Sequence, residues 1–124
     1  LEEPFEIKHK SGVRIRGRID RYDQSPATGE IHVYDYKYSR ADGLEEKYPI
    51  QGALYAQALG AKVSQFAYVA LREQAKAKVI AGEALTDLIT IAGGQIEQVL
   101  ADVNSGNIPV RPVDEALCRY CDYR

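Results

Sequence analysis

The sequence lacks the features that mark several special classes of protein. Among 124 residues there is no methionine or tryptophan, and two cysteines are too few for the disulfide framework of a small secreted protein. No apolar run approaches the roughly 20 residues of a transmembrane helix. Sixteen basic against eighteen acidic residues give a net charge of −2, so no global positive field indicates nucleic-acid binding. The sequence therefore predicts a cytoplasmic protein with no membrane partner.

What is present fits one folded domain. Hydrophobic residues make up 45% and charged residues 27% of the chain, which excludes wholesale disorder. A length of 124 residues is close to the commonest size for a single core. Because the chain starts at Leu1 and contains no methionine, we expect it to be a fragment of a longer protein.

Five segments have the alternating or β-branched pattern of strands. Ser11-Gly12 separates the first two as a turn, and a stretch rich in turn residues precedes the third. The predicted strands are residues 4–10, 13–22, 30–39, 65–72 and 78–80.

Two further segments have helical periodicity. Pro49 suits the first turn of a helix, and apolar residues recur at helical spacing until Gly60 ends it. We expect the second helix to begin near Thr86 or Asp87, either of which is a good N-cap, and to run to Asn104. This order predicts an α/β (α+β) fold with a mixed central sheet flanked by helices.

The third strand carries charges where a core strand should have none. Alternation puts Ile31 and Val33 on the same face as Asp35 and Lys37. Burying a charge without a partner costs on the order of several kcal/mol, so two charges on a buried strand face need an explanation. One interpretation is a salt bridge in solvent at a strand end that leaves the core. The other is a functional site.

The second strand favours the functional interpretation. Its outer face ends in Asp20 after a row of arginines, and a hairpin can bring Asp20 beside Asp35 if Asp20 pairs near Val33. The sequence does not fix that register. Two carboxylates beside Lys37 form a site for Mg²⁺ or Mn²⁺ that suits phosphodiester hydrolysis.

Two polar residues of the first predicted helix add to this set. Gln51 and Tyr55 are four residues apart, so they share one helix face directly after the third strand. There they can reach a phosphate or an attacking water. The alternative is that both are ordinary residues at the boundary between the polar and apolar faces of the helix.

Three short motifs, in this order, resemble the PD-(D/E)XK nuclease superfamily and its RecB/AddB-type exonuclease branch. They are Gly-Arg-Ile-Asp-Arg at 17–21, Asp-Tyr-Lys at 35–37, and Gln-Gly-Ala-Leu-Tyr at 51–55. The resemblance implies a restriction-endonuclease-like core that lacks its first helix in this chain. It also implies a role for each motif residue. Metal would be held by Asp20, Asp35 and the Tyr36 carbonyl, and catalysis would use these two acids with Lys37, Gln51 and Tyr55.

The same resemblance divides the chain into two parts. Residues 1–107 would form the nuclease core, and residues 108–124 an extended tail that carries Cys118 and Cys121. Many members of the branch hold a [4Fe–4S] cluster, which needs four thiolates. Two cysteines cannot supply them, so we expect a cluster only in the full-length protein and none in this chain.

The leading hypothesis is a metal-dependent DNA exonuclease domain from a RecB-type nuclease or helicase–nuclease of DNA repair and recombination. Its partners would be DNA and a helicase domain or subunit, and the chain alone should have little activity because it lacks the upstream helix. The alternative is a catalytically inactive nuclease fold that serves as a DNA-binding or scaffolding module. A local basic strip for DNA would consist of Arg16, Arg18, Arg21 and Arg40.

Overall fold

The computed structural model describes residues 2–48, 50–109 and 115–120. Within them the chain forms six strands, three α-helices and two short 3₁₀ helices. In chain order these are β1 (Glu3–Lys8), β2 (Arg14–Ile19), β3 (Arg21–Gln24), β4 (Ile31–Lys37), α1 (Leu44–Lys47), α2 (Gln51–Leu59), β5 (Val63–Ala70), η1 (Leu71–Glu73), β6 (Lys76–Ala81), α3 (Glu83–Ser105) and η2 (Glu115–Tyr120).

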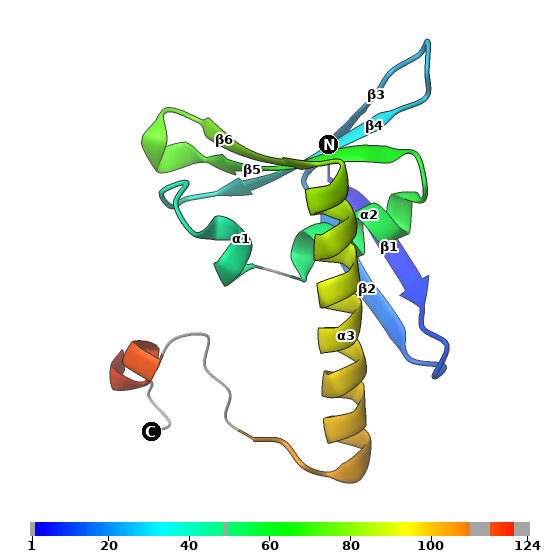
Figure 1. Cartoon of the computed structure of the whole chain (residues 1–124), viewed down its shortest axis with the longest axis vertical. Helices are drawn as coiled ribbons and strands as arrows, with labels where there is room; N and C mark the ends of the chain where they lie inside the picture. Colours follow the sequence, from blue (N-terminus) through cyan, green and yellow to red (C-terminus); the bar gives the residue numbers. More distant parts are fainter. Residues whose placement is uncertain (1, 49, 110–114, 121–124) are drawn as a thin grey trace.

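A mixed four-stranded sheet is the centre of the fold. Its strand order is β3-β4-β5-β6, with β4 and β5 parallel and the two outer pairings antiparallel. The parallel pair is joined through α2, as parallel strands require a crossover connection. Strands β1 and β2 form a separate hairpin that lies beside α2, and the helices lie on the same side of the sheet (Figure 1). The predicted mixed α+β class is confirmed.

The core lies between the sheet and these helices. β5 is buried over five consecutive residues, from Phe66 to Ala70, as expected for a central strand covered by neighbours. β4 alternates instead, with Ile31, Val33 and Asp35 buried and the residues between them more exposed. None of the described helices is long and apolar enough to cross a membrane.

The predicted second strand is divided into two. β2 ends at Ile19 and pairs with β1, whereas β3 begins at Arg21 and pairs with β4. Asp20 is the residue between them, at the point where the chain passes from the hairpin to the main sheet. The single strand predicted for residues 13–22 was therefore wrong in a way that matters for the site.

The helix ends differ from the predictions in one case. α2 ends at Leu59, and the φ of 87° at the following Gly60 explains why the helix stops there as predicted. Pro49 lies outside the described residues. α3 starts at Glu83, so Thr86 and Asp87 are not its N-cap. The Thr86 hydroxyl donates to the Gly82 carbonyl inside the first turn. η2 also places a short helix within the predicted extended tail.

The close packing of α2 on the sheet depends on a glycine. A Cβ added at Gly52 would lie 2.8 Å from the ring of Phe66, which is fully buried. We expect Gly52→Ala to lower the free energy of unfolding by about 1–3 kcal/mol, because the ring has no room to yield. Denaturant unfolding measures this. The matched control is Gly94→Ala in α3, where a Cβ would have open space. It should raise stability by about 0.5–1 kcal/mol, and equal effects of the two variants would contradict the packing argument.

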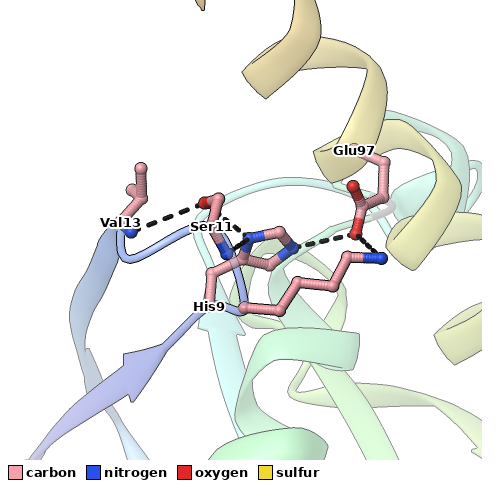
Figure 2. A network of polar contacts seen from close by, with 5 residues as sticks. His9, Ser11, Val13 and Glu97 are labelled. Atoms are coloured by element: carbon pink, nitrogen blue, oxygen red, sulfur yellow. Dashed lines mark hydrogen bonds and ion pairs between the residues drawn. The ribbon is translucent and has the colours of Figure 1, made fainter.

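A polar network ties the tip of the β1–β2 hairpin to α3. The backbone N–H of Ser11 donates to His9 Nδ1 (3.1 Å), and His9 Nε2 lies 2.9 Å from Glu97 Oε1 (Figure 2). Since Nδ1 accepts from Ser11, Nε2 carries the hydrogen of the ring and donates a hydrogen bond to the Glu97 carboxylate. Lys10 Nζ lies 3.0 Å from the same carboxylate oxygen. His9 thus has a connecting role in the fold.

This network predicts a pH dependence of stability. Lys10 first, and then His9, lower the pKa of Glu97 below its ordinary value of 4.5. A carboxyl with a depressed folded-state pKa stabilises the fold above its unfolded pKa, and that contribution is lost as the pH falls through the folded value. Glu97→Gln should therefore unfold at lower urea than the unmodified protein at neutral pH, and the difference should vanish under acid conditions. Glu30→Gln is the control, and a difference that persists in acid would refute this account.

Candidate active site

The strand register brings the two predicted acids together. Arg21 pairs with Tyr34 and Tyr22 with Val33, so the residue before β3, Asp20, lies opposite Asp35. The Tyr36 backbone N–H donates to Asp20 Oδ2 at 2.9 Å, which fixes this carboxylate against the end of β4. The pairing is two residues beyond the Val33 position that the sequence argument assumed.

Asp35 is the buried charge of the core. Only 1% of the residue is exposed. Burial is the main cause that raises the pKa of Asp35, and the nearby Asp20 charge also raises it, whereas Lys37 lowers it. Among the described residues its Oδ2 atom has no hydrogen-bond donor of good geometry, although Lys37 Nζ is 2.9 Å away as an ion pair. The carboxylate oxygen is thus held by charge alone, by the ammonium of Lys37, within the described residues.

Lys37 is enclosed as well. Only 17% of its side chain is exposed, so the interpretation of a salt bridge in solvent was wrong. Its Nζ donates to Gln51 Oε1 at 2.7 Å and lies 4.2 Å from the centre of the Tyr48 ring. The ammonium is therefore held beside the carboxylates.

α2 brings Gln51 and Tyr55 to the same place. Gln51 Nε2 donates to the Tyr55 hydroxyl at 2.7 Å, and Gln51 Oε1 accepts from Lys37. Burial raises the pKa of the Tyr55 phenol, Gln51 lowers it, and the charges of Asp35 and Asp20 raise it again. Tyr55 therefore stays protonated at neutral pH. The five predicted catalytic residues form one continuous group.

Sequence reasoning missed one member of this group, Tyr48. It follows α1, a short helix that the periodicity did not predict. No motif marks Tyr48, and its only sequence signal is a position just before the predicted helix.

The predicted basic strip is largely neutralised by its neighbours. Arg16 Nε lies 2.6 Å from Glu6, and Arg18 lies 3.3 Å from Glu2. Arg21 makes two contacts with Asp23, which is also the main cause of a raised Arg21 pKa. Arg40 is exposed. These pairs reduce the positive potential that the arginine side chains would offer to DNA.

The donor set fits a hard divalent cation. Asp20 and Asp35 supply carboxylates, and one of their oxygens is buried without a hydrogen bond. Because the N–H and C=O of a strand residue point to the same edge, the Tyr36 carbonyl faces the Asp20 side. Oxygen ligands of this kind are those that Mg²⁺ and Mn²⁺ take. In the described part of the chain, no three or more His, Cys, Asp or Glu side chains come together in a way that could hold a metal ion, so the two carboxylates would need the backbone carbonyl as a further ligand.

Of the two cysteines predicted to contribute to a cluster, the structure describes one. Cys118 lies in η2 as a half-buried free thiol. Cys121 lies outside the described residues.

Comparison with known families identifies the class of protein. Residues 1–124, the whole length, match the PD-(D/E)XK nuclease superfamily. The chain belongs to this superfamily, which indicates a nuclease that acts on DNA, and its mixed sheet with flanking helices agrees with a restriction-endonuclease-like fold. No curated protein matches the chain.

Proposed function

We propose that this domain is a metal-dependent DNA exonuclease of the RecB/AddB type. The observation that carries the proposal is the buried carboxylate of Asp35, opposite Asp20 and in contact with Lys37. Burying the Asp35–Lys37 ion pair costs desolvation free energy that well-packed apolar residues would avoid, so its presence on a core strand favours a functional role. The order of the three motifs supports the RecB/AddB branch.

Each residue has a task that its position supports. A divalent ion, Mg²⁺ or Mn²⁺, would polarise the scissile phosphate and lower the pKa of the attacking water. Asp20, Asp35 and the Tyr36 carbonyl would hold it. The Lys37 ammonium faces the same volume, where it offsets the negative charge that develops on the phosphate oxygens.

The helix residues support Lys37. Gln51 accepts a hydrogen bond from Lys37 and donates one to Tyr55, so it fixes the direction of both side chains. Tyr55 keeps its phenolic proton because of burial and the nearby acids, and it can donate that proton in a hydrogen bond to a phosphate oxygen. The site would in this way align the phosphate and the water for in-line attack.

The second candidate is an inactive nuclease fold that binds DNA or holds a partner. The intact set of Asp20, Asp35 and Lys37 favours the enzyme instead, since an inactive copy is free to lose any of the three. The proposed RecB-type assignment includes a helicase partner, a role in DNA repair and a cytoplasmic location. It also includes an iron–sulfur cluster that Cys118 and Cys121 bind in part. Iron and sulfide analysis of the purified full-length protein tests the cluster.

One experiment separates the candidates. The full-length protein is incubated with end-labelled linear DNA and with closed circular DNA, in Mg²⁺, in Mn²⁺ and with a chelator. An exonuclease degrades the linear DNA only and stops when the metal is removed. Cleavage of the circle would show an endonuclease, and binding without hydrolysis in either metal would favour the scaffold.

A further inference from the structure

The ammonium of Lys37 lies over the aromatic ring of Tyr48. The 4.2 Å between Nζ and the ring centre is well within the range of a cation–π contact. Asp35 and Gln51 approach the same nitrogen at 2.9 and 2.7 Å. Of the three N–H groups of the ammonium, one donates to Gln51, whereas Asp35 contributes an ion pair and the Tyr48 ring an aromatic contact.

Backbone hydrogen bonds of Tyr48 hold this residue against the core. The Tyr48 N–H donates to the Leu44 carbonyl at 3.0 Å, and the Tyr48 carbonyl accepts from the Tyr68 hydroxyl. Tyr68 is fully buried and packs edge-on against Phe66 at 4.7 Å between ring centres. The position of Tyr48 is therefore set by the core, although the residue is 38% exposed.

A lysine needs such support to act from a fixed place. Its four-carbon stem is flexible and its ammonium is a point charge with no preferred direction. The Asp35 contact lacks hydrogen-bond geometry, which leaves Gln51 as the only directional oxygen partner among the described residues. The flat face of Tyr48 limits where Nζ can move.

We propose that Tyr48 is a positioning residue that holds the Lys37 ammonium in the site through its aromatic face. This role rests on the proposed nuclease function. Tyr48 acts through Lys37 and makes no contact with DNA. It follows that the aromatic ring is needed and the hydroxyl is not.

The test compares Tyr48→Leu with Tyr48→Phe in the full-length protein. Leucine keeps an apolar side chain without a π face, whereas phenylalanine keeps the face without the hydroxyl. We expect Tyr48→Leu to lower kcat by about 10-fold, with KM for DNA changed less than about twofold. Tyr48→Phe should keep the kcat of the unmodified protein. The control is Tyr38→Leu, because Arg72 lies over the Tyr38 ring at 5.9 Å while Lys37 does not. It should leave kcat unchanged.

A second readout does not depend on activity. In NMR spectra the ε-methylene protons of Lys37 should be shifted upfield by the Tyr48 ring, in the unmodified protein and in Tyr48→Phe but not in Tyr48→Leu. A shift that survives in Tyr48→Leu would overturn the proposal. So would a raised KM with unchanged kcat, because Tyr48 would then be a DNA contact.

The two readouts separate this proposal from the one it rests on. If the unmodified protein hydrolyses no DNA in either metal, the nuclease function fails. The NMR comparison then decides alone whether Tyr48 holds Lys37.

Discussion

Asp35→Asn in the full-length protein is expected to lower DNA hydrolysis at least about 10²-fold and to weaken Mg²⁺ or Mn²⁺ binding in parallel. The variant keeps the shape of the side chain and removes the charge that the buried site holds. Asp20 alone would remain as a carboxylate ligand, and a single acid holds a hard cation poorly. Calorimetric titration with each metal and a hydrolysis assay measure the two effects.

The control for Asp35→Asn is an acid outside the site. Asp87→Asn changes an exposed residue of α3 and should leave both metal binding and hydrolysis unchanged. Thermal unfolding checks that each variant is folded. Full hydrolysis by a folded Asp35→Asn protein would remove the proposed metal site and with it the mechanism.

Lys37→Met is expected to lower kcat about 10²–10³-fold, on the order of 3–4 kcal/mol, while DNA affinity stays nearly constant. The structure decides the choice of variant. Lys37 is mostly buried against Tyr48, so truncation to alanine would leave a gap, whereas methionine fills a similar volume without the charge. Hydrolysis rates and fluorescence anisotropy with labelled DNA separate the two quantities.

A lysine outside the site gives the comparison for Lys37→Met. Lys62→Met alters an exposed lysine before β5 and should hydrolyse DNA at the normal rate. If Lys37→Met also retains the normal rate, the inactive scaffold becomes the better account of this fold. A loss of DNA binding equal to the loss of rate would place Lys37 in substrate binding instead of catalysis.

Local sequence patterns were sufficient to predict that Asp35 and Lys37 lie on one face of a strand and that Gln51 and Tyr55 share one face of a helix. The period of a strand fixes that Asp35 and Lys37 share a face with Ile31 and Val33, and the structure confirms that this face is buried. The period of a helix likewise places Gln51 and Tyr55 together. These relations depend only on backbone geometry between near neighbours, so they can be predicted without knowing the rest of the fold.

Contacts between distant segments decided the remainder. The register that places Asp20 opposite Asp35 arises because the chain leaves one sheet at Ile19 and enters the other at Arg21. No periodicity in the sequence marks that break, and a shift of one residue would send the carboxylate to the other face.

Charge pairing and loop position were also beyond the sequence. Arg16 and Arg18 look like a basic strip until the β1–β2 pairing brings Glu6 and Glu2 beside them. Tyr48 lies over Lys37 because Tyr68, twenty residues further on, binds its carbonyl. Sequence alone therefore determined which residues of β4 and α2 are candidates for the chemistry. Tertiary structure decided which distant partners complete it, because those contacts depend on how separate elements pack and not on local spacing.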